Sequence, residues 1–103
     1  MSKLTEVAER QIIRKEILDI LAETDQEGAS TKVLKLALSK QGHELTDLTL
    51  NLELKYLQGK NLVQLDQVSN PALGIHRTIV HITSRGIDVL EGTIQVEGIE
   101  VGE

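Results

Sequence analysis

The sequence predicts an α+β domain in which three helices lead into a two-stranded hairpin, and two neighbouring patterns support this prediction. Leu50, Leu54 and Leu57 recur at the spacing that lines one side of a helix, and Asn61 tolerates the left-handed conformation in which helices often end. Over residues 62–66 apolar and polar side chains then alternate, which is typical of a half-buried strand. A helix that passes through a short turn into a strand is therefore the centre of the domain.

The composition narrows the class of protein. The chain has 103 residues, of which 40% are hydrophobic and 1% aromatic, so it suits one domain with an aliphatic core. It contains no cysteine, which excludes disulfides and thiolate metal sites and suits a reducing cytoplasm. No apolar run reaches the roughly 20 residues of a membrane span, and the polar start lacks the apolar region of a signal peptide. We therefore expect a cytoplasmic protein without a membrane partner.

Two helices are predicted ahead of the central one. The first covers about Thr5 to Glu23, and polar residues 24–29 form the loop after it. Ser30 caps the second helix, which ends at about Lys40. The side chains expected to point inward are Ile13, Ile17, Ile20 and Leu21 in the first helix and Val33, Leu34, Ala37 and Leu38 in the second.

Short-range signals also place the third helix and the hairpin. Gly42 ends the second helix, and Thr46 or Asp47 caps the third, which spans residues 46–58. A helix, a turn and a further helix in this order form a helix-turn-helix.

The hairpin consists of a strand at 62–68, a loop at 69–76 that holds the only proline, and a returning strand at 78–82. Such a hairpin after three helices is a wing. Residues 1–92 are therefore predicted to form a winged helix-turn-helix.

The end of the chain adds a short helix and a tail. Thr83 caps the helix and Gly92 ends it. Residues 93–103 alternate apolar with polar side chains and are acidic. We expect an acidic C-terminal tail, an added edge strand or an arm that packs on a neighbouring molecule, with disorder as the simpler alternative.

Several short motifs resemble those of a known group of proteins. They are Gly42-His43 before the third helix, Leu54–Leu57 within it, Thr83–Asp88, Glu91-Gly92 and Val96–Ile99. On these residues the chain is similar to small, mostly uncharacterised winged-helix proteins of Mu-like bacteriophages. More distantly, the passage from the third-helix leucines into the following strand resembles MarR-type and ArsR-type regulators. The resemblance implies a winged-helix fold and a phage-encoded, transcription-regulator-like protein.

The charge pattern argues against strong non-specific DNA binding. The formal net charge is −5, and residues 41–92 carry four Lys or Arg against six Asp or Glu. Because neutralised phosphates supply most of the non-specific affinity, an acidic chain is a poor candidate for it. Lys32 and Lys35 on the outer side of the second helix, with His76 and Arg77 at the root of the wing, are placed where helix-turn-helix proteins contact phosphates.

The third helix has a second apolar stripe opposite its buried leucines, formed by Leu48, Leu52 and Tyr56. DNA-reading helices carry polar or cationic residues on this side, and Glu53 on its flank would be repelled by phosphate. The sequence leaves three interpretations open. The stripe is buried by the tail or the wing, it is a dimer or partner surface, or it faces DNA with leucines against thymine methyl groups.

We expect a DNA-binding protein of the transcription-regulator kind and not an enzyme. The alternative is a protein–protein interaction or dimerisation module without DNA readout. The histidines of the chain lack metal-ligand spacing, and no Gly-rich phosphate loop is present. We therefore expect no catalytic residue, metal or cofactor. The expected partners are double-stranded DNA, a second copy in a homodimer and, in the alternative, another protein. The predicted DNA contacts are Lys32, Lys35, Thr46, Thr49, Asn51, Lys55 and Arg77, and the predicted protein interface is Leu48, Leu52 and Tyr56.

Overall fold

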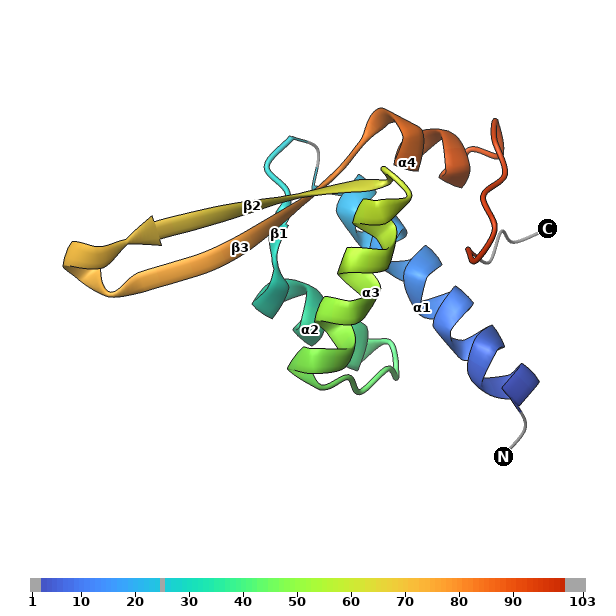
Figure 1. Ribbon diagram of the computed structural model, residues 1–103, viewed down its shortest axis with the longest axis horizontal. Helices are drawn as coiled ribbons and strands as arrows, with labels where there is room; N and C mark the ends of the chain where they lie inside the picture. Colours follow the sequence, from blue (N-terminus) through green and yellow to red (C-terminus); the bar gives the residue numbers. More distant parts are fainter. Residues whose placement is uncertain (1–2, 25, 100–103) are drawn as a thin grey trace.

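The chain folds as an α+β structure, which a computed structural model describes for residues 3–24 and 26–99 (Figure 1). The described strands form one antiparallel sheet in the order β1-β3-β2. The architecture is compatible with the predicted winged helix-turn-helix. In chain order the elements are α1 (Lys3–Ala22), β1 (Ala29–Ser30), α2 (Thr31–Lys40), α3 (Asp47–Gly59), β2 (Val63–Asn70), the short 3-10 helix η1 (Pro71–Leu73), β3 (Ile75–Ile82) and α4 (Ser84–Leu90).

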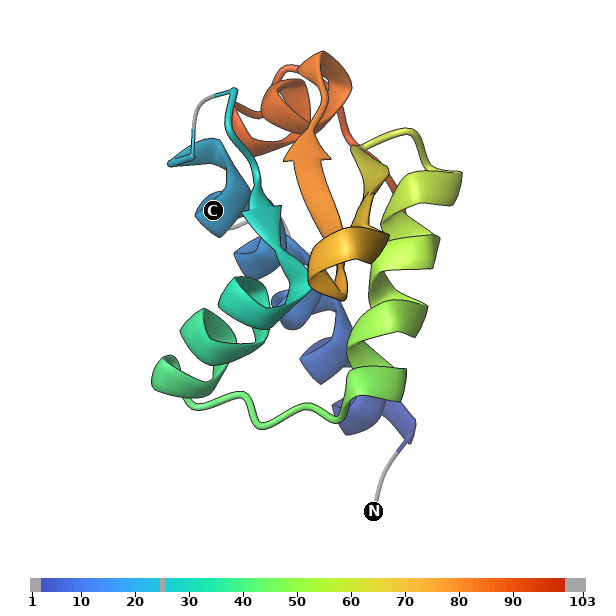
Figure 2. The same cartoon turned by 90° about the vertical axis from the view of Figure 1, so that its left-hand side faces the viewer.

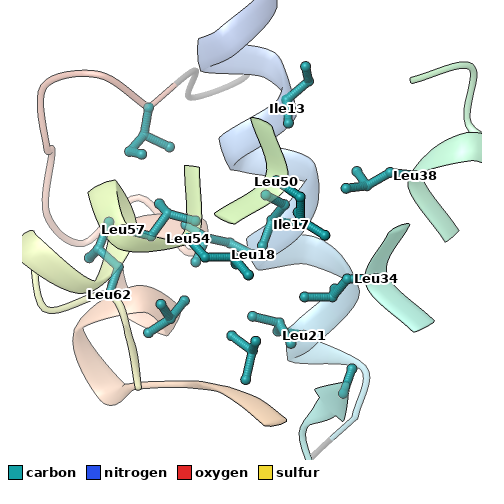
Figure 3. Packing of buried hydrophobic residues seen from close by; sticks show 14 of the residues in the cluster. Ile13, Ile17, Leu18, Leu21, Leu34, Leu38, Leu50, Leu54, Leu57 and Leu62 are labelled. Atoms are coloured by element: carbon teal, nitrogen blue, oxygen red, sulfur yellow. The ribbon is translucent and has the colours of Figure 1, made fainter. Parts of the chain in front are cut away.

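The core lies where α1, α2 and α3 meet the end of the sheet that is next to the helices. Leu18 of α1 is fully buried, and Figure 3 shows Leu54 of α3 pointing toward it, with Leu34 of α2 close by. Val80 of β3 is also fully buried and joins the sheet to this cluster. Among the described residues the buried hydrophobic side chains are all Leu, Ile, Val or Ala, as the composition predicts.

The helix ends form where the sequence predicts them. Ser30, Thr46 and Thr83 each accept a hydrogen bond from the backbone N–H three residues further on, at 3.2, 3.1 and 3.1 Å. The chain adopts the left-handed conformation at Gly42 (φ 94°) and Asn61 (φ 64°), which ends α2 and α3. These local signals fix the directions of α2 and α3.

The prediction of inward-facing residues is wrong for Val33, which is 54% exposed. Helix α2 buries Leu34 and Leu38, one turn apart, so Val33 lies about 100° around the helix on the solvent side. In α1, Leu18 is fully buried in place of Ile20, which is only partly buried.

The hairpin is longer than the sequence predicts. Strands β2 and β3 pair over eight residues each, so the turn shrinks to residues 71–74. Arg77 lies opposite Val68, close to this turn, and the expectation that it sits with His76 at the root of the wing is wrong. The reason is that the ladder of backbone hydrogen bonds continues through polar residues that composition alone assigns to a loop. The hairpin projects away from the helices (Figure 1).

Residues 93–99 lie against the helices and form no strand, so the alternative of an added edge strand is not realised there. Ile99 is 6% exposed, and the Tyr56 hydroxyl donates a hydrogen bond to the backbone carbonyl of Glu97 at 3.1 Å. This part of the tail therefore covers the C-terminal half of α3. The remainder of the predicted tail, residues 100–103, lies outside the described residues.

Candidate nucleic-acid interface

Two adjoining grooves lie where α2, α3 and the hairpin come together; Figure 2 shows the hairpin between the two helices. The groove between α2 and α3 has a volume of about 440 Å³, and the groove between α3 and the hairpin about 340 Å³. Asn51 of α3 and Thr78 of β3 line both, so the grooves form one surface. We call it the helix–hairpin face, and its residues are Thr31, Lys32, Lys35, Asp47, Leu48, Leu50, Asn51, Leu52, Leu54, Lys55, Leu65, Gln67 and Thr78.

The groove between α2 and α3 carries the predicted lysines of α2. Lys32 is exposed and has no ion-pair partner among the described residues. Lys35 lies 2.9 Å from Asp47, Nζ to Oδ1, with side chains 43% and 86% exposed. Because exposed pairs contribute about 0–1 kcal/mol, this pair can be exchanged for another anion at little cost. Both lysines are therefore available to a phosphate that enters the groove.

The groove between α3 and the hairpin is lined by two predicted DNA contacts and by two leucines of the second apolar stripe. Leu48, Asn51, Leu52 and Lys55 follow one another at intervals of three, one and three residues, so they share one side of α3. Leu48 is 69% exposed and Leu52 is 58% exposed. This side of α3 thus presents an amide and an ammonium group together with two apolar side chains.

Tyr56 does not belong to that exposed surface. Its ring is partly buried, the Arg14 guanidinium lies 3.7 Å from the ring centroid, and its hydroxyl is bonded to the tail. Of the three interpretations of the second stripe, burial by the tail therefore holds for Tyr56, whereas it is wrong for Leu48 and Leu52. The three side chains do not form one continuous patch.

Glu53 is buried, and the expectation that it would face phosphate is wrong. It is 5% exposed, and its Oε1 lies 2.6 Å from Nε of Arg14 on α1. Arg14 also donates from Nη1 to the backbone carbonyl of Gly98 at 2.9 Å. Arg14 thus holds together α1, α3 and the tail, and Glu53 adds no negative charge to the helix–hairpin face.

Thr46 and Thr49 are bonded to each other at the start of α3. The Thr46 hydroxyl accepts a hydrogen bond from the backbone N–H of Thr49 at 3.1 Å and donates one to the Thr49 hydroxyl oxygen at 2.9 Å. Neither residue lines either groove. Their observed role is to hold the first turn of α3, and like Arg77 they are predicted DNA contacts that lie outside the grooves.

The hairpin contributes residues that sequence reasoning missed. Thr78 and Gln67 are cross-strand neighbours, joined by a hydrogen bond of 3.1 Å between their side chains, and both line the groove beside α3. Arg77 immediately precedes Thr78 in β3, so its side chain lies on the side of the hairpin opposite to that of Thr78. His76 falls on the same side as Thr78. Gln67 and Thr78 could have been identified only from the pairing register of β2 and β3, and the predicted loop at 69–76 does not give that register.

Charge is distributed unevenly over the fold. Residues 31–40, 47–59 and 67–78 carry five Lys or Arg against two carboxylates, and one of the two, Glu53, is buried. Helix α1 carries four acidic residues together with four Lys or Arg, whereas residues 88–97 carry three acidic residues and no Lys or Arg. The net charge of −5 therefore does not describe the helix–hairpin face. That face carries three lysines and one carboxylate, that of Asp47, on an acidic protein, whereas the hairpin strands balance Arg77 with Asp66.

Comparison with known proteins identifies no relative for this chain. Searches against protein-family models, curated proteins and solved structures find no significant match. Within the described ranges no group of three or more His, Asp or Glu side chains is placed to hold a metal ion. No helix in that part of the chain is long and apolar enough to cross a bilayer. The helix–hairpin face is therefore the feature of the described chain whose chemistry points to a function.

Proposed function

We propose that the protein is a winged helix-turn-helix that binds double-stranded DNA, in the manner of a small transcription regulator of phage or prophage type. The phage and regulator aspects follow from the resemblance of its motifs. The observation that carries DNA binding is the excess of lysines on the helix–hairpin face, three against one carboxylate, because a cationic face on an acidic chain suits a polyanion.

The arrangement of elements suggests a docking geometry. In helix-turn-helix proteins the second helix of the motif enters the major groove while the first crosses the phosphate backbone. Here α3 would enter the groove with Asn51 and Lys55, and α2 would bring Lys32 and Lys35 to phosphates. The hairpin strands, at about 3.3 Å per residue, are long enough to carry Arg77 to the backbone beyond the helix.

The salt dependence of duplex binding tests this proposal. Lys32, Lys55 and Arg77, with Lys35 released from Asp47, would neutralise three or four phosphates per protomer. The logarithm of the association constant should then fall with the logarithm of salt concentration at a slope of about −3 to −4 between about 50 and 200 mM salt. Fluorescence anisotropy with a labelled duplex measures this slope. Absence of binding at the lowest salt concentration, or an association constant that does not change with salt concentration, would contradict the proposal.

A second candidate function is protein–protein interaction, favoured by the exposure of Leu48 and Leu52. In that case the two leucines would meet a second copy or another protein, as in the expected homodimer. This candidate predicts that truncating both leucines lowers the mass of the assembly in solution. It also predicts no affinity for duplex DNA.

A further inference from the structure

We infer that Leu48 and Leu52 contact thymine methyl groups in the major groove, with Asn51 beside them hydrogen-bonded to adenine, so that this face selects duplex DNA rich in A·T pairs. The inference rests on the proposed DNA binding and names the class of sequence that the same face prefers.

The geometry of α3 supports this assignment. Leu48, Asn51 and Leu52 lie on one exposed side of the helix, and all three line the groove next to the hairpin. The Asn51 side chain has no hydrogen-bond partner among the described residues. An amide that is free to form hydrogen bonds therefore lies beside two side chains that cannot form them.

This combination matches the major-groove edge of an A·T pair. Thymine presents a C5 methyl group there, and adenine presents N7 and the N6 amino group, which an asparagine amide can bond in a bidentate manner. A G·C pair has no methyl group at this edge, and leucines packed against its hydrogen-bonding groups would remove water without replacing the hydrogen bonds that water makes. The stripe also has no arginine, the residue that most often reads guanine.

The surroundings of the two leucines favour DNA over a protein as the occupant. Lys55 lies on the same side of α3, and Lys32 and Lys35 lie across the adjoining groove. Lys32 and Lys55 have no ion-pair partner in the described part of the chain. A polyanion would satisfy these cations while its methyl groups cover the leucines. Charge complementarity thus points to the same occupant as the apolar contacts.

Replacement of thymine by deoxyuridine tests the inference, because it removes the methyl group and keeps the base pairing. An alternating A·T duplex and its A·U counterpart are titrated with the wild type and with the double variant Leu48→Ala/Leu52→Ala. A methyl group buried on binding is worth about fourfold in affinity, so two contacts should favour the thymine duplex on the order of tenfold. In the double variant this ratio should fall to about one. Leu36→Ala on α2, a residue 59% exposed and outside the helix–hairpin face, is the matched control and should keep the ratio.

The comparison of ratios separates a methyl contact from any change that deoxyuridine makes to the duplex itself, because such a change would affect both proteins equally. Equal, salt-dependent binding of both duplexes by the wild type would overturn the inference and leave DNA binding intact. Absence of binding to either duplex would overturn both. A lower mass of Leu48→Ala/Leu52→Ala in solution, with no change in the ratio, would assign the leucines to a protein contact instead.

Discussion

Replacing Arg14 by methionine should lower the free energy of unfolding by about 3–5 kcal/mol, because it leaves the Glu53 carboxylate buried without its charge partner. The side chains of Arg14 and Glu53 are 13% and 6% exposed, and their closest atoms are 2.6 Å apart. The change also removes the bond to the Gly98 carbonyl and the contact with the Tyr56 ring. Urea unfolding followed by circular dichroism measures the loss. Tyr56, the only aromatic residue, gives a fluorescence signal from the same site.

Two variants make this result interpretable. Asp19→Asn breaks the partly exposed pair of Lys15 with Asp19, whose Nζ and Oδ2 lie 2.9 Å apart and whose side chains are 35% and 45% exposed, and should cost about 0.5 kcal/mol or less. Arg14→Met/Glu53→Leu removes both buried charges and should recover most of the loss. If Arg14→Met cost no more than Asp19→Asn, the Arg14–Glu53 pair would be solvated and would not hold α1, α3 and the tail together.

Reversing the charges of Lys32 and Lys55 should weaken duplex binding at least about a hundredfold, since each charge-assisted contact is worth about 1.5–3 kcal/mol. The salt slope should also become shallower by about two, because two phosphates are no longer neutralised. Both lysines are exposed, so Lys32→Glu/Lys55→Glu should leave the unfolding free energy nearly unchanged. Anisotropy titrations at several salt concentrations measure both quantities.

The control for this variant is Lys3→Glu/Arg10→Glu on α1. It changes the net charge of the protein by the same amount at exposed positions outside the helix–hairpin face. We expect it to lose only the small long-range component of the affinity. Equal losses in the two double variants would mean that net charge governs binding and that the face has no special role.

The parts of the fold that the sequence predicts correctly depend on local signals. The cap at Thr46 and the left-handed residue at Asn61 act over three or four residues, so composition and spacing are sufficient to place both ends of α3. The same holds for the buried leucines of α3, since their spacing alone defines one face.

The errors concern contacts between residues far apart in the chain. Glu53 lies one residue before a buried leucine, and only the packing of α1 against α3 shows that Arg14 meets it. In the same way, the hairpin register depends on pairing between the residues on either side of the turn. This pairing puts His76 and Arg77 in β3 close to the turn, a position that composition could not predict.

The candidate interface is intermediate between these cases. Lys32, Asn51 and Lys55 could be assigned to outer helix faces from spacing, and the structure brings them to adjoining grooves. The cationic character of the face could not be predicted, because it depends on the burial of Glu53 and on the position of the acidic residues 88–97 outside the two grooves. A net charge summed over the chain does not contain that information.

The most direct test of the proposed DNA-binding surface is a titration of isotope-labelled protein with a short duplex at low salt, followed by amide NMR. We expect the largest shifts at Lys32, Asn51, Lys55 and Thr78, which line the helix–hairpin face, and little change in the first half of α1. Shifts concentrated in α1 or in residues 93–99, or no shifts at saturating duplex, would contradict the account.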